Sequence, residues 1–128
     1  MKKKINDVMI KASYDYAKRV YRNEIEFSKA LDLISTTTQM DRGSALAYVT
    51  SFRAMMDGQE YHRTMNTAAT QYYLENILKD YGLNQLVTAL VAVDLHTKYY
   101  SNLKHGSLRS IERLVKDYKE SIETQLTR

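Results

Sequence analysis

The 128-residue chain contains no cysteine, no proline and no tryptophan, and only four glycines. Without cysteine it has no disulfide, no thiolate zinc site and no cysteine nucleophile. Its longest apolar run, residues 86–95, is far shorter than the roughly 20 residues of a membrane span. The Met-Lys-Lys-Lys start also lacks the apolar stretch of a signal peptide. We therefore expect a soluble, cytoplasmic protein with no membrane partner.

Signals of catalysis are also missing. The three histidines, His62, His96 and His105, form no helical i, i+4 pair and have no carboxylate at a metal-site spacing. Dispersed histidines of this kind are more often surface or core-edge residues than ligands. No two glycines lie closer than Gly43 and Gly58, so there is no glycine-rich phosphate loop. The sequence predicts a protein that is not an enzyme and needs no cofactor or metal.

The remaining composition favours helices. Because proline is absent and apolar residues recur at 3.6-residue spacing, the chain reads as all-α, a compact bundle of about five to six helices in one domain, 1–128. We divide it into a basic first helix (1–23), a helical hairpin (24–58) and a three-helix remainder (64–128). The expected helices cover residues 3–22, 24–35, 41–57 and 65–81, followed by one that opens at Asn84 and one capped by Ser107.

Capping residues and helix breakers set these boundaries. Asn23 stands three residues before Glu26, the spacing of a capping box. The β-branched run 36–38 is a poor helix interior and predicts the end of the second helix. The other expected caps and stops are Asp41, Gly58, Thr64 or Asn66, and Gly82.

Apolar spacing also predicts which faces are buried. The stripe of the first helix is Ile5, Met9, Ala12, Tyr16 and Val20. In the fifth helix the apolar positions, among them Val87 and Val91, wrap much of the circumference. This pattern favours a helix buried at the centre of the bundle.

The net charge of +4 is unevenly distributed. Residues 1–23 carry seven basic residues (Lys and Arg) and two Asp. Residues 24–58 carry three basic residues and five acidic ones. A basic first helix and an isoelectric point near 9.2 permit attraction to nucleic-acid phosphates. The alternative is that the lysines simply solvate an exposed helix face, as charge runs commonly do.

Residues 33–52 have the pattern of a helix-turn-helix. Ser35 would be the small residue of the first helix, Met40 the buried turn residue, and Ala45 with Tyr48 the inward pair of the second helix. Arg42, Ser44 and Arg53 would then lie on or near its exposed side. A plain helical hairpin explains the same apolar pattern, because the turn lacks the usual glycine and the segment is net negative.

The tyrosines and methionines allow two interpretations. In the pairs Tyr72-Tyr73 and Tyr99-Tyr100, one ring of each can face inward and the other outward, where it could stack on unpaired bases. The same rings equally suit the edge of a core that has no tryptophan. Met55, Met56 and Met65, with several tyrosines, could instead provide an adaptable surface for another protein.

Several short motifs are similar to a helical module of bacterial HNH-type restriction endonucleases. They are Gly43-Ser44-Ala45, Tyr48-Val49, the run 52–58, Tyr61, Arg63-Thr64, Asn66, Ala68-Ala69, Tyr72, the run 74–77 and Asp80-Tyr81-Gly82. The resemblance continues through His96, Tyr99-Tyr100 and Leu108 to Tyr118, and so covers about residues 28–119. In those enzymes the module precedes the nuclease domain, which implies a role in binding or selecting DNA. This chain has no HNH motif, so the resemblance implies no cleavage.

Two functions follow as expectations. The first is a non-catalytic DNA-binding or targeting module of a bacterial restriction or defence system, with double-stranded DNA and a nuclease as partners. Arg42, Ser44 and Arg53 would approach the duplex, and the phosphate contacts would be Lys2, Lys3, Lys4, Arg63 and Lys104. The alternative is a helical module for protein–protein interaction, including a homo-oligomer.

Overall fold

The computed structural model describes residues 4–126, and all regular secondary structure in this range is helical. The helices are α1 (Asp7–Tyr21), α2 (Phe27–Thr38), α3 (Arg42–Asp57), α4 (Thr67–Tyr81), α5 (Leu83–Asn102) and α6 (Arg109–Leu126). The predicted all-α bundle is therefore confirmed.

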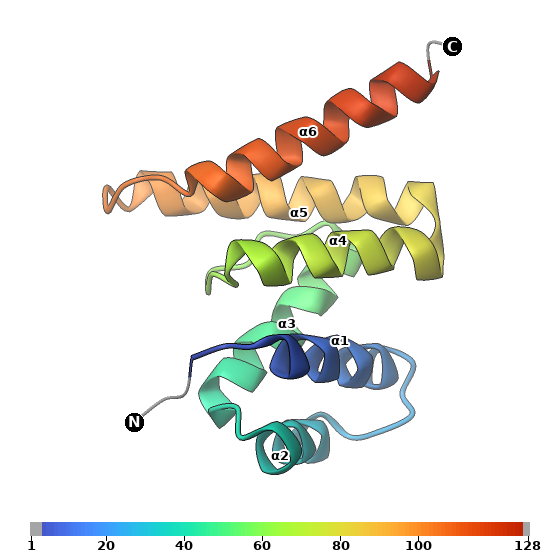
Figure 1. Ribbon diagram of the computed structural model, residues 1–128, viewed down its shortest axis with the longest axis vertical. Helices are drawn as coiled ribbons and strands as arrows, with labels where there is room; N and C mark the ends of the chain where they lie inside the picture. Colours follow the sequence, from blue (N-terminus) through green and yellow to red (C-terminus); the bar gives the residue numbers. More distant parts are fainter. Residues whose placement is uncertain (1–3, 127–128) are drawn as a thin grey trace.

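Helix α3 connects the two ends of the bundle. Figure 1 shows α1 and α2 at one end, α4 and α5 towards the other and α6 outermost, with α3 running between them. Helix α3 packs against α1, α2 and α5, and α1 also contacts α4. The prediction that the fifth helix lies at the centre is wrong, since Val87 and Val91 of α5 are 44% and 48% exposed. The central helix is α3.

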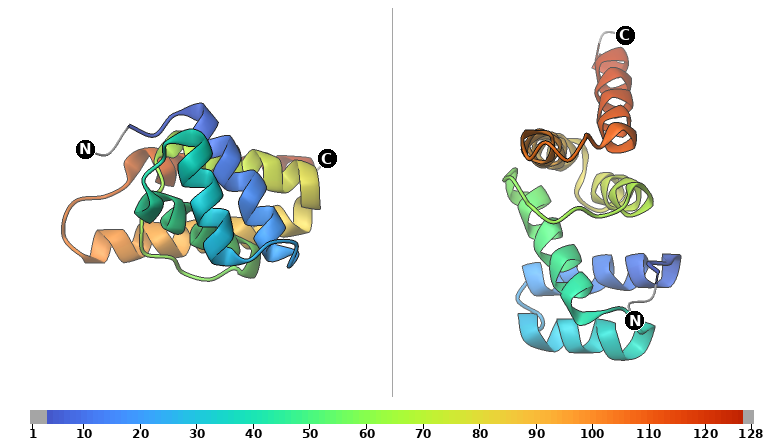
Figure 2. Two further views of the ribbon diagram at one scale, coloured as in Figure 1. Left: turned by 90° about the horizontal axis from the view of Figure 1, so that it is seen from below. Right: turned by 90° about the vertical axis from the view of Figure 1, so that its left-hand side faces the viewer.

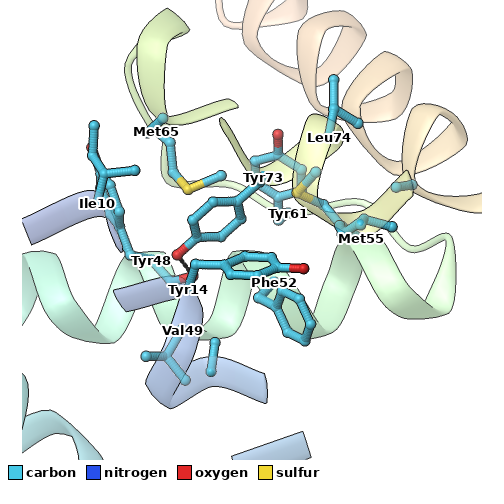
Figure 3. Close-up of a cluster of buried hydrophobic side chains, with 14 of the residues drawn as sticks. Ile10, Tyr14, Tyr48, Val49, Phe52, Met55, Tyr61, Met65, Tyr73 and Leu74 are labelled. Atoms are coloured by element: carbon cyan, nitrogen blue, oxygen red, sulfur yellow. Dashed lines mark hydrogen bonds between the residues drawn. The ribbon is translucent and has the colours of Figure 1, made fainter. Parts of the chain in front are cut away.

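The core forms where aromatic residues of α1, α3 and α4 meet. Tyr14 packs edge-to-face on Phe52 and on Tyr73, with ring centroids 5.4 and 5.3 Å apart, as Figure 3 shows. The Tyr73 hydroxyl donates a hydrogen bond of 3.1 Å to the Tyr48 carbonyl oxygen, so this buried polar group is satisfied. These contacts join the α1–α2 end to the α4–α5 end.

The boundaries of α3 and α4 agree with the capping predictions. The Asp41 side chain accepts from the Ser44 N–H, and the Asn66 side chain, rather than Thr64, accepts from the Ala69 N–H. Gly58 ends α3 in the left-handed conformation, with φ of 67°. Both ends of the central helix are thus fixed by local sequence.

The capping box predicted at Asn23 and Glu26 is wrong. Helix α2 begins only at Phe27, and Glu26 makes no side-chain capping bond. Asn23 instead takes φ of 60° just after α1, where the Glu24 N–H donates to the Arg19 carbonyl oxygen at 2.8 Å. Because asparagine tolerates the left-handed region, it serves here as the end of one helix rather than the start of the next.

Other boundaries also differ from the predictions. Helix α1 begins at Asp7 rather than at residue 3, because the Asn6 side chain caps it by accepting from the Met9 N–H. Helix α2 continues through the threonine run to Thr38, and within it the hydroxyls of Thr37 and Thr38 donate to the carbonyl oxygens four residues earlier. Helix α6 begins at Arg109 and not directly after Ser107: the Glu112 N–H donates to the Leu108 carbonyl oxygen, which places Leu108 at the flanking position.

Candidate nucleic-acid interface

Helices α2 and α3 form a helix-turn-helix-like pair. Residues 39–41 join them, with Gln39 in the left-handed conformation (φ 67°) that a glycine usually supplies. Met40 in the turn is 1% exposed, and Ala45 and Tyr48 are buried, as the spacing predicts. In Figure 1, α2 is seen nearly end-on while α3 lies across the view, so the two helices cross steeply.

One side of α3 remains exposed along its whole length. Its residues, called here the α3 flank, recur at intervals of four or three: Arg42, Leu46, Thr50, Arg53 and Asp57. The flank lies between two clefts. One, of about 280 Å³, separates it from α1 and α2, and the other, of about 310 Å³, separates it from the segment after α3. The second half of α3 therefore forms a ridge at the surface.

Two of the three predicted α3 residues lie on the same side of the helix. Arg42 and Arg53 are eleven positions apart, which places them within about 20° on the helix and about 16 Å apart along it. Ser44 lies about 200° from Arg42, is half-buried, and gives its N–H to the Asp41 cap. Ser44 therefore lies off the α3 flank.

The two arginines differ in how firmly they are held. Arg42 Nε donates to Asp32 Oδ1 at 2.8 Å, and its Nη2 donates to Ser28 Oγ at 3.1 Å. Arg53 reaches Asp57 only at 4.0 Å, and its side chain is 79% exposed. Arg42 is thus anchored on α2, whereas Arg53 projects into solvent with a weak ion pair.

The predicted phosphate contacts come from separate segments of the chain. Lys2 and Lys3 lie outside the described residues, and Lys4 is exposed just before α1. Arg63 is exposed, and its Nη1 donates to the Gly43 carbonyl oxygen at 2.8 Å, which holds it beside the start of α3. Lys104 is exposed in the α5–α6 connection. Figure 2 (right) shows this connection, the segment after α3 and α3 itself towards the same side.

His96 fixes the segment that carries Arg63. The His96 side chain is fully buried and stacks on Tyr61 at 4.3 Å between ring centroids. Its Nδ1 lies 2.5 Å from the Tyr61 carbonyl oxygen, and its Nε2 lies 2.9 Å from Thr64 Oγ1. Since a carbonyl oxygen only accepts, Nδ1 carries the proton and the Thr64 hydroxyl donates to Nε2. Burial lowers the pKa of His96, which favours this neutral form.

Sequence reasoning missed this role of His96, having placed the histidines at the surface or core edge. A buried histidine among apolar residues of a helix was the available signal, but its partners are 32 and 35 residues away. The other two histidines, His62 and His105, are exposed.

The aromatic pairs separate only in part. Tyr73 is fully buried and Tyr72 half-buried, as predicted for a pair on a helix, whereas Tyr99 and Tyr100 are both half-buried. The prediction of a methionine contact surface is wrong. Met55, Met56 and Met65 are 0%, 6% and 1% exposed and belong to the core.

The fold and its exposed flank define an all-α bundle with a helix-turn-helix-like segment. Comparisons of the chain with protein-family models, curated proteins and solved structures give no match. Between residues 4 and 126, no helix is long and apolar enough to cross a bilayer. In the same range no three His, Asp or Glu side chains come close enough together to hold a metal ion.

Proposed function

We propose that this chain binds duplex DNA through the α3 flank, as a non-catalytic targeting module of a bacterial restriction or defence system. The observation that carries the proposal is the α2–α3 pair: a short turn, a buried Met40, and a second helix whose outer side presents Arg42 and Arg53. The restriction setting rests on the motif resemblance over residues 28–119.

The two residues nearest the start of the flank have side chains that suit the major groove. A recognition helix contacts base edges with the residues near its start, where Arg42 and Leu46 lie. The guanidinium of Arg42 suits the two acceptors of guanine, and Leu46, which is 39% exposed, suits a thymine methyl group. In this arrangement Arg42 exchanges its bond with Asp32 for one with DNA.

Phosphate contacts come from outside the flank. Arg63 lies next to the first turn of α3, whereas Lys4 lies just before α1 and Lys104 lies in the α5–α6 connection. Contacts of this kind orient a protein on the duplex and make its affinity depend on salt. The acidic partners Asp32 and Asp57 reduce nonspecific attraction, so specificity depends on groove contacts.

Fluorescence anisotropy with labelled duplexes, methylated and unmethylated, tests the proposal at low salt. We expect saturable binding that weakens steeply as salt rises. Arg42→Ala should weaken it about 5- to 150-fold, the effect of losing one base contact worth about 1–3 kcal/mol. Arg113→Ala, an exposed arginine of α6, is the matched control and should change affinity less than about twofold. No binding at tens of micromolar protein, or equal losses in both variants, would refute it.

A second candidate function is self-association through α5. Its residues Leu83, Val87 and Val91 are 37%, 44% and 48% exposed, and residues 83–93 contain no charged side chain. An uncharged apolar stripe of this kind matches a copy of itself across a two-fold axis. Light scattering should then show a dimer that Val91→Glu converts to a monomer. A wild-type monomer at high concentration would refute this function.

A further inference from the structure

A second feature of the surface lies directly beside the α3 flank. The cleft of about 310 Å³ is lined on one side by Thr50, Ser51 and Ala54 of α3, and on the other by residues 60–63. Its volume is at the lower end of the range for small-molecule sites, about 300–1,000 Å³. The cleft therefore has room for one flat, ring-sized group.

An exposed imidazole with an aromatic support forms one wall of the cleft. The ring of His62 stacks on that of Tyr99, with centroids 4.0 Å apart and planes 14° apart. Because Tyr99 covers one face and 59% of the His62 side chain is exposed, the other face is accessible. The Glu60 carboxylate lies 2.8 Å from His62 Nε2 and fixes the rotation of the ring.

The support extends into the core of the protein. Tyr99 lies nearly parallel to His96, with centroids 6.5 Å and planes 24° apart, and His96 stacks on Tyr61. His96 in turn is fully buried and bonded at both ring nitrogens. The orientation of the exposed ring is thus set by α5 and not by a free loop.

The polar groups around the cleft include both a hydrogen-bond acceptor and hydrogen-bond donors. The Glu60 carboxylate accepts hydrogen bonds, and Arg63 carries five N–H donors, of which the bond to Gly43 occupies one. A ring that stacks on His62 would therefore meet an acceptor and a donor at its edges. Nucleobases have this chemistry: every base has a π-face, and its edges carry donors and acceptors.

We propose that this cleft binds an unpaired nucleobase, stacked on His62 with its edge towards Glu60 and Arg63. A base inside a duplex is stacked on both sides, so the ligand is a base of a single strand or one extruded from a duplex. The inference rests on the proposed DNA binding, and the cleft adjoins the α3 flank because Thr50 belongs to both. It adds a second recognition site to that function.

Fluorescence of 2-aminopurine, a base analogue whose emission falls when it stacks, tests the inference. Two probes are used with the full chain: a single-stranded oligonucleotide, and a duplex with the analogue opposite an abasic site. Stacking in the cleft should change the emission of at least one probe at saturation. His62→Ala should abolish this change and weaken binding of that probe about 5- to 150-fold, the range for one base–aromatic stack. His105→Ala, at an exposed histidine that does not line the cleft, should leave both unchanged.

The outcomes show whether the base comes from a single strand or from a duplex, and they distinguish the cleft proposal from the α3-flank proposal. A response from the single strand alone, or from the abasic duplex alone, identifies the source and supports the cleft. Tyr99→Leu should reduce the response and Tyr99→Phe should retain it, since the second keeps the supporting ring. An unchanged emission from both saturated probes, or equal behaviour of His62→Ala and His105→Ala, overturns the inference. If the cleft proposal fails in this way but a fully paired duplex still binds, the proposed DNA binding by the α3 flank stands. If a probe responds but a fully paired duplex does not bind, the α3-flank proposal is overturned instead.

Discussion

Replacement of His96 by phenylalanine should destabilise the protein and make its stability less dependent on pH. The phenyl ring keeps a stack on Tyr61, but it is larger than the imidazole and places a carbon where Nδ1 met the Tyr61 carbonyl oxygen, so some repacking adds to the loss. Both hydrogen bonds of the imidazole are lost, at 2.5 Å to the Tyr61 carbonyl oxygen and at 2.9 Å to the Thr64 hydroxyl. The substitution therefore removes the hydrogen bonds of His96 while keeping an aromatic ring at this position.

The magnitude follows from the surroundings of the two partners. The Thr64 hydroxyl belongs to an exposed residue, so water replaces its bond at a cost of about 0.5–1.5 kcal/mol. The Tyr61 carbonyl is in a buried bond and is left without a donor, which costs about 1–3 kcal/mol. We expect His96→Phe to lower the free energy of unfolding by about 2–4 kcal/mol at pH 7.5, measured by urea unfolding followed by circular dichroism.

The wild-type protein should also lose stability as the pH falls below 6.5, the ordinary pKa of histidine. Burial lowers the pKa of His96 in the folded state, so in this window the unfolded chain takes up a proton that the folded protein does not. The stabilisation is complete above pH 6.5 and is lost as the pH falls towards the lower, folded-state pKa. In His96→Phe this part of the pH dependence should disappear.

The matched control is His105→Phe, at an exposed histidine, which should change the free energy of unfolding by less than about 0.5 kcal/mol and retain the pH dependence. A His96→Phe variant as stable as the wild type would contradict the proposed anchoring of residues 61–64. So would an unchanged pH profile between pH 6.5 and 5.

Two further predictions concern the ends of α3. Asp41→Ala removes the side chain that accepts from the Ser44 N–H at 3.2 Å, and should lower the free energy of unfolding by about 0.5–2 kcal/mol. Asp41→Asn keeps a capping oxygen and should retain most of the wild-type stability. Gly58→Ala places a Cβ at φ of 67° and 3.1 Å from Thr88 Cγ2, and should cost about 1–2 kcal/mol or more; Thr88→Ala in the same chain should recover the steric part. Urea unfolding measures all four variants, and no loss in Asp41→Ala or Gly58→Ala would contradict the assigned cap or turn.

The helices that the sequence predicts best are those whose ends depend on neighbouring residues. Asp41 and Gly58 bracket α3, and both act within one turn of the helix. Asn23 shows the limit of such signals, because the same residue type suits a helix start and a left-handed helix end. Which of the two occurs depends on how the chain turns to place α2 against α1 and α3.

The buried face of α1 was harder to predict. The expected stripe shares only Met9 with the buried residues, which are Met9, Ile10, Ser13, Tyr14 and Ala17. The predicted stripe includes Tyr16, yet Tyr14 is the tyrosine that is buried, with 1% exposure, and Tyr16 is only half-buried. The Tyr14 hydroxyl reaches the core boundary and donates to Asp80 of α4 at 2.8 Å, where Lys18 also binds the same carboxylate. The partner of this hydroxyl lies 66 residues away, so the spacing within α1 does not reveal it.

The α3 flank and the cleft differ in the same way: the first depends on local sequence and the second on contacts between distant residues. The exposure of Arg42 and Arg53 can be predicted from the period of one helix. When α3 turns Ala45, Tyr48 and Phe52 inward, its opposite side remains at the surface. The cleft beside them depends on contacts between Tyr61 and His96 and between His62 and Tyr99, which lie on a connecting segment and on α5. No local spacing encodes such pairs.

Because α3 forms one wall of the cleft and is also the centre of the core, the flank and the cleft keep a fixed relation to each other. A base bound in the cleft would therefore fix the position of its own strand relative to the side chains of the α3 flank.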